Sequence, residues 1–262
     1  MERCLKMKIY KIKAKEIFTK SKLPGCDYVI NQYVGCEHAC SYCYARFISR
    51  WKKRGEWDTW VEAKINAPEL VKGRKIDGTV FMSSISDPYQ PIEKELKLTR
   101  KILENMDKNI RLSIQTKSDL VLRDIDLFKQ FKNLDIGFTI NSFAGEQKED
   151  FEPNSSTNKE RIAALKKLHE AGIKTYVFIS PIIPGLIDLE KVIKETKNYT
   201  EYYWFEMINM GGAGKSFQEM LQQKYSENYK MAKDKKVLED YREKIKELVK
   251  KYNIKVQGIE IH

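Results

Sequence analysis

The sequence predicts an α/β fold in which helical crossovers cover a parallel sheet. Strand-like and helix-like segments alternate along most of the chain, which is the pattern that produces such a sheet. The 262 residues are enough for one barrel-sized domain, and 42% of them are hydrophobic, which is enough for a core and too apolar for a disordered chain. We find no Pro/Ser-rich linker and no repeat of fixed period, so we expect one domain.

Six short segments rich in β-branched or aromatic residues are the expected strands. They span residues 28–34, 79–83, 111–116, 135–140, 173–179 and 203–208. Helical patterns lie between them at residues 41–54, 93–106, 120–131, 158–171 and 189–197, and the fourth ends at Gly172, a typical C-cap residue. Two charged amphipathic helices, at 216–229 and 233–252, and a strand at 254–261 are expected to follow. We therefore divide the chain into a basic N-terminal segment (1–27), a strand–helix body (28–210) and a C-terminal extension (211–262) that closes it.

Lysine and arginine outnumber the acidic residues by 48 to 37, and much of this excess lies in two blocks. Residues 1–22 hold eight basic and two acidic side chains, and no acidic residue interrupts the second block at residues 44–54. The second block consists of Arg46, Arg50, Lys52, Lys53 and Arg54. DNA or RNA would bind such blocks because neutralised phosphates release counterions, but a Lys-rich solvated surface explains the same charge.

No segment reaches the roughly 20 consecutive apolar residues that a membrane-spanning helix needs. The longest nearly apolar stretch, at 176–187, is interrupted by Ser180, Pro181, Pro184 and Gly185. The N-terminus is basic but lacks the apolar region and the cleavage site of a secretory signal. We therefore expect the protein in the cytoplasm.

Three of the five cysteines, Cys36, Cys40 and Cys43, lie within eight residues with the spacing C-x3-C-x2-C. This odd, closely spaced set fits a disulfide framework poorly and indicates a metal or iron–sulfur site. Three thiolates can hold three irons of a [4Fe–4S] cluster and leave the fourth iron open to a chelating substrate. The alternatives are a zinc site of the three cysteines with His38 and a purely structural thiol cluster. His38 lies between the first two cysteines, where a tetrahedral loop is sterically awkward, so we expect it to orient the loop instead.

The stretch GCEHACSYCYAR at residues 35–46 resembles the cluster loop of radical S-adenosylmethionine (SAM) enzymes, and more narrowly that of the spore photoproduct lyase-like branch of DNA repair enzymes. The likeness covers about residues 28–195 and continues through SDPYQPIE (86–93), LTR (98–100), QTKS (115–118), LRD (122–124), Glu152-Pro153, Arg161 and PIIPG (181–185). It implies a partial (β/α)6 TIM barrel of the radical SAM type with a C-terminal helical and strand extension. It also implies an enzyme of lyase or transferase type.

The resemblance implies two cofactors, a [4Fe–4S] cluster and SAM, and a low-potential electron donor similar to flavodoxin or ferredoxin. Reductive cleavage of SAM would yield a 5′-deoxyadenosyl radical that abstracts hydrogen from the substrate. Cys36, Cys40 and Cys43 would ligate the cluster. The residues that would contact SAM follow the cluster loop or a predicted strand: Tyr42 at the adenine, Ser86 and Asp87 at the methionine amino group, Lys117 at the carboxylate, and Thr139 or Asn141 at the ribose.

Positions at the carboxyl ends of strands are those where a β/α barrel carries its active site, which supports this assignment. The Gly-Gly-Glu that the family usually has at the amino-group site is absent, and Ser86-Asp87 stands there. Two plainer interpretations stay open. Lys117 can be an ordinary surface lysine, and Asp87 can be a turn-forming residue before Pro88.

The likeness leaves the substrate open. Spore photoproduct lyases use a late cysteine as hydrogen donor, and this chain has none after Cys43. Tyr89, Tyr202 or Tyr203 could donate instead, and Cys4 and Cys26 are more simply small buried residues. Repair or modification of a nucleic acid is one expectation; a peptide or small metabolite is the alternative substrate, and an iron–sulfur sensor is the non-catalytic alternative.

Three other patterns each have a plain explanation. The segment GGAGKS at 211–216 ends like a phosphate-binding P-loop, but Asn209 occupies the place of its first glycine, so we expect a flexible loop. The aromatic run at 199–205 could stack on bases but more often indicates a packed strand. Trp51, Trp57 and Trp60 suit either nucleic acid or packing on the barrel wall.

Overall fold

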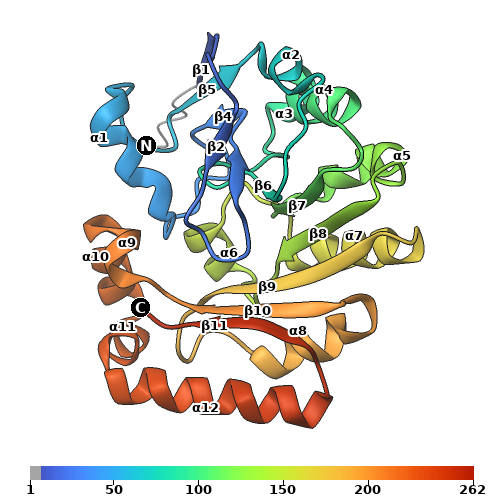
Figure 1. Ribbon diagram of the computed structural model, residues 1–262. Coiled ribbons are helices and arrows are strands. Elements are labelled where there is room, and N and C mark those ends of the chain that lie inside the picture. Colours follow the sequence, from blue (N-terminus) through green and yellow to red (C-terminus); the bar gives the residue numbers. More distant parts are fainter. Residues whose placement is uncertain (1–6) are drawn as a thin grey trace.

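The computed structural model describes residues 7–262 (Figure 1). Cys4 and the first two basic residues, Arg3 and Lys6, lie outside the described part. The strands are β1 (Lys8–Ile12), β2 (Phe18–Lys20), β3 (Tyr28–Ile30), β4 (Tyr33–Val34), β5 (Trp60–Lys64), β6 (Thr79–Met82), β7 (Arg111–Thr116), β8 (Asn133–Thr139), β9 (Lys174–Ile182), β10 (Tyr202–Met207) and β11 (Val256–Glu260).

Helices follow most of these strands. The α-helices are α1 (Ser49–Lys52), α2 (Ala67–Val71), α3 (Glu93–Leu96), α4 (Leu98–Asn105), α5 (Ile125–Phe128), α6 (Glu146–Phe151), α7 (Asn158–Glu170), α8 (Leu189–Thr196), α9 (Met210–Ala213), α10 (Lys215–Lys224), α11 (Ser226–Lys233) and α12 (Lys235–Tyr252). Three further segments are 3-10 helices: η1 (Tyr44–Ile48), η2 (Asp119–Asp124) and η3 (Lys197–Tyr199).

One eight-stranded sheet forms the body, in the order β11-β10-β9-β8-β7-β6-β3-β2. Every pairing from β3 to β11 is parallel, and only β2 runs antiparallel, against β3. The six expected strands are thus β3 and β6 to β10, side by side in chain order, with the helices between them. The predicted α/β fold, a partial barrel with a parallel sheet, is confirmed.

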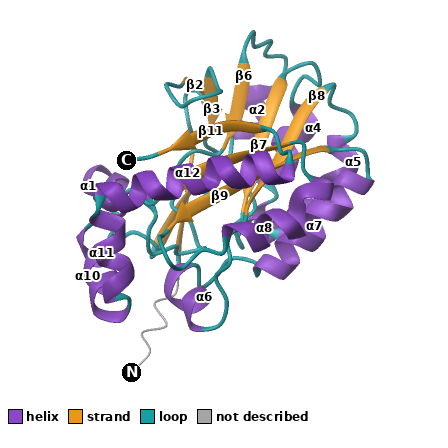
Figure 2. Ribbon diagram, turned by 90° about the horizontal axis from the view of Figure 1, so that it is seen from below, coloured by secondary structure: helices purple, strands orange, loops and turns teal. Residues whose placement is uncertain are grey.

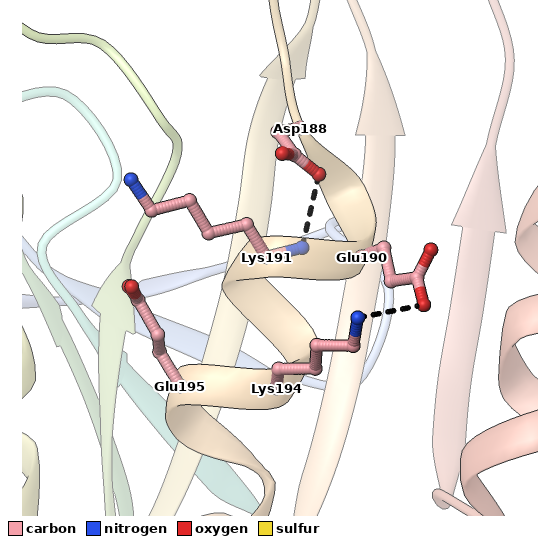
Figure 3. Close-up of a pocket in the computed structure, with 5 residues that line it drawn as sticks. All are labelled: Asp188, Glu190, Lys191, Lys194 and Glu195. Atoms are coloured by element: carbon pink, nitrogen blue, oxygen red, sulfur yellow. Dashed lines mark hydrogen bonds and ion pairs between the residues drawn. The ribbon is translucent and has the colours of Figure 1, made fainter.

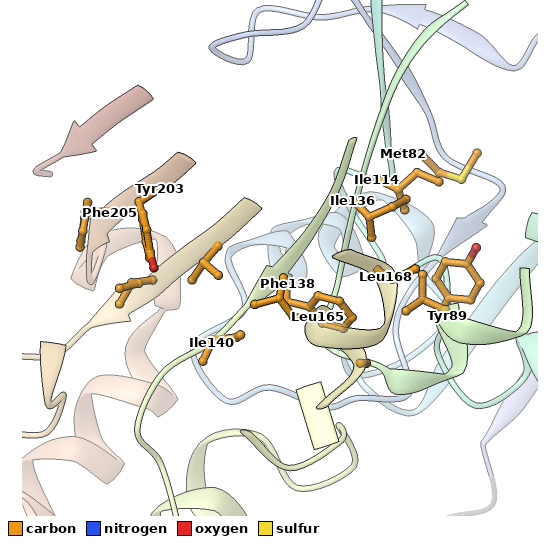
Figure 4. Close-up of a cluster of buried hydrophobic side chains, with 14 of the residues drawn as sticks. Met82, Tyr89, Ile114, Ile136, Phe138, Ile140, Leu165, Leu168, Tyr203 and Phe205 are labelled. Atoms are coloured by element: carbon orange, nitrogen blue, oxygen red, sulfur yellow. The ribbon is translucent and has the colours of Figure 1, made fainter. Parts of the chain in front are cut away.

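The core lies between this sheet and its helices (Figure 4). Side chains alternate along the strands, so in β10 Tyr203, Phe205 and Met207 are buried while Tyr202, Trp204 and Glu206 face the other side of the sheet. On that side Gly137 of β8 leaves room for the ring of Tyr176 on β9, because a Cβ at Gly137 would lie 2.0 Å from the ring. Four of the five aromatic residues in the run at 199–205 therefore belong to a packed strand, and Tyr199 lies in η3.

A second, three-stranded sheet, β1-β5-β4, was not expected. β1 runs parallel to β5, and β4 pairs with β5 in the opposite direction. The single strand expected at 28–34 is consequently split, since β3 joins the large sheet and β4 the small one. The small sheet places residues 8–12 beside residues 60–64, so the N-terminal segment is built into the body.

Four expected helices are wrong in extent. The helix expected at 120–131 is instead the 3-10 helix η2 followed by the short α5, and the helix expected at 216–229 is divided at Tyr225 into α10 and α11. Residues 41–43 carry the last part of the cysteine loop, and the helix expected at 41–54 is reduced to the short segments η1 and α1. The helix expected at 93–106 is divided into α3 and α4 by Lys97, whose φ is +52°. In contrast, α7 follows the expected pattern and begins with a capping box between Thr157 and Glu160.

The C-terminal extension adds a seventh parallel strand, β11, to the edge of the sheet, next to β10. Figure 2 shows α12, α8 and α7 side by side over the outer face. The segment expected as a flexible loop at 211–216 is mostly helical, because the side chain of Asn209 caps α9 by accepting a hydrogen bond from the Gly212 amide at 2.7 Å. None of the helices in residues 7–262 combines the length and the apolar character needed to cross a bilayer.

Candidate functional site

The cysteine loop runs from the end of β4 to the start of η1. Gly35 begins it with a φ of +90°, and a Cβ there would lie 2.3 Å from the carbonyl oxygen of Trp60. Any other residue would therefore collide with β5, which explains the glycine. The amide of Cys43 donates to the carbonyl of Cys40 at 3.1 Å, so the last two cysteines share one tight turn. All three cysteines of the loop are free thiols, and Cys36 and Cys40 are buried.

Burial raises the pKa of each thiol of this loop, to about 12 for Cys40. The thiols also raise one another's pKa, since a thiolate on one disfavours a thiolate on the next. Lys117 opposes this effect at Cys40 and Cys43. Such closely grouped buried thiols become thiolates when a cationic group binds them, with release of protons.

The donor set and its surroundings fit an iron–sulfur cluster. Within residues 7–262, five buried side-chain polar atoms lack a hydrogen-bond partner, and four of them lie in the loop and the helical turns after it. They are His38 Nδ1, Ser41 Oγ, Arg46 Nε and Ser49 Oγ. Buried polar atoms are normally satisfied, so this concentration is the pattern expected where a bound group supplies partners. No three His, Cys, Asp or Glu side chains in the described chain converge closely enough to bind a single metal ion. A [4Fe–4S] cluster does not need such convergence, because each cysteine thiolate binds a different iron.

Asp87, after β6, joins the loop to two strands. Its carboxylate accepts hydrogen bonds from the Thr116 hydroxyl at 2.7 Å and from the Lys117 amide at 2.8 Å, both at the end of β7. The amide of Tyr89 also donates to it at 2.8 Å, so Asp87 does form the turn before Pro88 as well. His38 Nδ1 lies 3.4 Å away without a directed hydrogen bond. Burial alone would raise the pKa of Asp87, but His38 and these donors lower it to about 2.

Glu152 is the second anchor and lies fully buried between the loop and β8. It accepts hydrogen bonds from the Tyr42 hydroxyl and from the Asn141 amide, the latter at 3.0 Å, and it pairs with Arg161 of α7. Arg161 is itself fully buried and donates to the carbonyl of Thr139 at 3.0 Å. Burial alone would raise the pKa of Glu152, but Arg161, Lys117 and the hydrogen bonds lower it to about 2. A permanently charged pair therefore holds Tyr42 against the end of β8.

The remaining predicted SAM residues lie around these anchors. Lys117 is partly buried, with its ammonium 5.8 Å from the centre of the Tyr42 ring, so it is not an ordinary surface lysine. Burial alone would lower its pKa, but Cys40 and Glu152 raise it, so Lys117 stays cationic. The hydroxyl of Thr139 accepts from Gln115 at 3.1 Å. Ser86 donates to the carbonyl of Tyr33 at 3.1 Å, which directs its hydroxyl to the backbone of β4.

The structure thus brings Tyr42, Lys117, Thr139 and Asn141 to one end of the sheet, next to Cys40. Glu152 and Arg161 belong to the sequence likeness to radical SAM enzymes, but the sequence predicted no role for either residue. Only the residue types could have pointed to this ion pair, because no sequence spacing predicts that an acid at 152 contacts an arginine nine residues later. Their importance follows from burial, which only the fold reveals.

Other motif residues serve the fold. Arg123 pairs with Glu93 at 2.6 Å and with Asp124 at 2.8 Å, and Arg100 also reaches Asp124, at 2.9 Å. Tyr89 is fully buried and donates to Asp124 at 3.1 Å. These charged side chains connect α3 and α4 to η2 beneath the site.

Tyr202 and Tyr203, two of the alternative hydrogen donors, face opposite sides of the sheet. Tyr203 is buried on the helical side, within 2.8 Å of the Thr196 hydroxyl, and so lies away from the concave face. Tyr202 faces the inside, stacks on Tyr176 at 5.0 Å and donates to Asp135 at 2.5 Å. Cys26 is only half-buried in the turn between β2 and β3, so the expectation that it is a small buried residue is wrong.

A pocket on the helical layer is unrelated to this site. Its lining residues are all charged and lie on or just before α8: Asp188, Glu190, Lys191, Lys194 and Glu195 (Figure 3). Asp188 caps the helix and Glu190 pairs with Lys194 at 3.0 Å. These are ordinary helix-surface interactions, and none of the five approaches the cysteine loop.

Comparisons with known proteins agree with this geometry. The family model described as the radical SAM superfamily matches residues 30–196. Uncharacterized protein MJ0683 of Methanocaldococcus jannaschii is 51% identical over 257 residues, which cover 98% of this chain and 99% of the relative. Uncharacterized protein ORF301 of Acidianus two-tailed virus is 29% identical over 250 residues, covering 87% and 81% of the two chains.

Among solved structures, spore photoproduct lyase complexed with dinucleoside spore photoproduct has a TM-score of 0.70 and 17% identity, covering 97% of this chain and 82% of that chain. A mutant of spore photoproduct lyase with the same ligand has a TM-score of 0.59 and 20% identity, over 83% and 65%. At these identities the likeness shows the fold. The family model covers well over half of the chain, and the cysteine loop falls inside it; the chain is therefore an enzyme of the radical SAM superfamily.

Proposed function

We propose that this enzyme cleaves SAM at a [4Fe–4S] cluster held by Cys36, Cys40 and Cys43 and abstracts hydrogen from a nucleic acid, in a repair or modification reaction. The observation that carries the proposal is the group of three free thiols, beside unsatisfied polar atoms, at the carboxyl ends of parallel strands. When bound, the cluster and SAM supply a one-electron cleavage that yields methionine and a 5′-deoxyadenosyl radical.

The residues around the loop would position SAM. Lys117 carries a positive charge beside Cys40, where it would pair with the SAM carboxylate. The Tyr42 ring, fixed by Glu152, would contact the adenine. Thr139 and Asn141, at the end of β8, would meet the ribose. Ser86 and Asp87 would complete the amino-group site, with Asp87 acting chiefly through the loop that it orients.

A nucleic-acid substrate is favoured by the way the two basic blocks meet. The guanidinium of Arg54 lies 4.3 Å above the ring of Tyr10 on β1, so the first block adjoins the second in space. One structure of similar fold holds a dinucleoside spore photoproduct. The proposal does not extend to the same lesion, because spore photoproduct lyases use a late cysteine and no cysteine follows Cys43.

Reduction of the cluster requires an electron from outside the chain. We propose a low-potential protein donor similar to flavodoxin or ferredoxin. Dithionite can replace it in a test.

The test is 5′-deoxyadenosine formation by the anaerobically reconstituted protein with SAM and dithionite, with and without added DNA or RNA. A slow basal yield that nucleic acid raises would support the proposal. Cys40→Ala should abolish both the cluster absorbance and the product, while its circular dichroism stays that of the parent. A basal yield that no nucleic acid changes would redirect the search to peptides and metabolites, and no product from cluster-loaded protein would indicate a sensor.

A further inference from the structure

Three exposed aromatic rings follow directly on the cysteine loop: Tyr44 and Phe47 of η1 and Trp51 of α1, here called the aromatic ladder. The ring centres of Tyr44 and Phe47 are 6.4 Å apart, and those of Phe47 and Trp51 are 5.3 Å apart. Their exposed fractions are 46%, 37% and 71%. A continuous exposed aromatic surface of this kind marks an interaction site rather than a core.

The buried side of the same segment is already packed. Ala45 and Ile48 lie in a small core with Trp57 and Trp60, which are 4% and 0% exposed. Of the three tryptophans in this region, two therefore pack on the body and only Trp51 is presented to solvent. Figure 1 shows α1 at the edge of the molecule, and the three rings keep the exposed fractions given above although α9 packs against η1.

The charge beside the aromatic ladder is positive. Arg50 and Lys53 are exposed, and no carboxylate in the described chain lies within ion-pairing distance of either. Lys52 and Arg54 differ from these two residues, because both pair with Glu62 of β5, at 2.6 and 3.1 Å. The surface thus complements a polyanion and offers two cations that are free to bind it.

The inner end of the aromatic ladder reaches the site. Tyr44 follows Cys43 directly, and its hydroxyl donates to the carbonyl of Ser84, just past the end of β6. Arg46 is tied to the loop through the carbonyl of Ser41, at 3.1 Å. A ligand stacked along the rings would therefore run from solvent at Trp51 to the mouth of the barrel at Tyr44.

We propose that the aromatic ladder is a stacking platform for unpaired bases of a single-stranded nucleic acid, whose phosphates bind Arg50 and Lys53. The inference rests on the proposed function and narrows its substrate to an unpaired strand or loop. Bases in a duplex are stacked on one another, so only unpaired bases present their faces to protein rings. The platform would deliver one base towards the cysteine loop while its neighbours remain stacked.

The experiment measures binding and not chemistry. Fluorescence anisotropy of a labelled 12-nucleotide strand, and of the same strand annealed into a blunt duplex, is followed with the cluster-loaded protein under anaerobic conditions. We expect at least tenfold tighter binding of the single strand. Trp51→Ala should weaken single-strand binding about tenfold, Trp51→Phe should keep most of the affinity, and Ile65→Ala, at another exposed apolar residue, should bind like the parent.

Salt dependence separates stacking from phosphate binding. Arg50→Gln should reduce the slope of log affinity against log salt by about 0.7, whereas Trp51→Ala should leave the slope unchanged. Lys235→Gln, an exposed lysine on α12, is the matched control and should change neither affinity nor slope. Equal binding of strand and duplex, or parent-like affinity in Trp51→Ala, would overturn the proposal.

The two proposals fail separately. Strand binding that depends on Trp51 without any rise in 5′-deoxyadenosine would support the platform and overturn the proposed reaction on nucleic acid. A rise in 5′-deoxyadenosine that is the same in Trp51→Ala and the parent would support the reaction and overturn the platform.

Discussion

At the scale of single residues, two buried carboxylates fix the position of the cysteine loop. Asp87 connects His38 to the end of β7, and Glu152 connects Tyr42 to the end of β8. Both have a pKa of about 2, so both are charged at neutral pH. Hydrogen bonds to charged acceptors are stronger than neutral ones, which makes these anchors rigid.

Lys117→Ala tests the SAM assignment. Loss of a cation that pairs with the SAM carboxylate should weaken SAM binding about tenfold or more, because hydrogen bonds to charged groups contribute about 1.5–3 kcal/mol. The cluster absorbance should be retained, since Lys117 is not a ligand. Lys132→Ala, an exposed lysine before β8, is the control. Equal SAM affinity in Lys117→Ala and the parent would remove Lys117 from the site.

Glu152→Gln tests the second anchor. Arg161 would remain buried without a charged partner, so the free energy of unfolding should fall by about 3–5 kcal/mol in a urea titration. The double variant Glu152→Leu with Arg161→Met should lose clearly less than the sum of the two single variants, because no unpaired charge remains. Additive losses would contradict the view that the two residues act as a pair.

Residue types predicted the cysteine site but not its anchors. The spacing of Cys36, Cys40 and Cys43 points to one chemistry because few other uses bring three thiols so close. Glu152 and Arg161 are common residues whose meaning depends on being fully buried, and burial arises from strands that are far apart in the sequence.

At the scale of elements, the cysteine loop is shaped by its neighbours rather than by helix propensity. Residues 41–54 have a helical pattern, yet the loop keeps residues 41–43 out of regular helix and leaves two short turns. Most of the large sheet was predictable because its strands are short segments rich in β-branched or aromatic residues, whereas the antiparallel edge strand β2 was not expected. The small sheet was not, because β4 has only two residues and β1 is rich in lysine.

Gly35→Ala tests the start of the loop against Gly172→Ala as a control. Both glycines have positive φ, but a Cβ at Gly172 meets no atom within 4 Å, whereas at Gly35 it meets the Trp60 backbone. Gly172→Ala should therefore cost only the conformational term of about 1 kcal/mol. Gly35→Ala should cost at least twice as much and also lower the iron content of the reconstituted protein. Equal losses in the two variants would contradict this account of the loop.

At the scale of the whole molecule, the barrel is open between β11 and β2, and the two basic blocks, the aromatic ladder and the cysteine loop lie on connected elements. The sequence could show each block but not their meeting, which depends on the pairing of β1 with β5.

Acid should destabilise the cluster-free protein in a defined range. The pKa values of Asp87 and Glu152 fall from ordinary values of 3.8 and 4.5 to about 2, so their stabilising effect is full above about pH 5 and is lost as the pH falls towards 2. Urea unfolding at pH 6, 4 and 2.5 checks this. The Glu152→Leu/Arg161→Met variant should show a smaller dependence, and a dependence equal to that of the parent would contradict the assignment to Glu152.

The most direct test of the central claim is hydrogen transfer from the substrate. Reconstituted protein is incubated with SAM, dithionite and a single-stranded oligonucleotide deuterated at its carbon atoms, and the 5′-deoxyadenosine is analysed by mass spectrometry. We expect product that carries one deuterium, because the hydrogen comes from a carbon of the nucleic acid. Product without deuterium, at an unchanged yield, would contradict a nucleic-acid substrate.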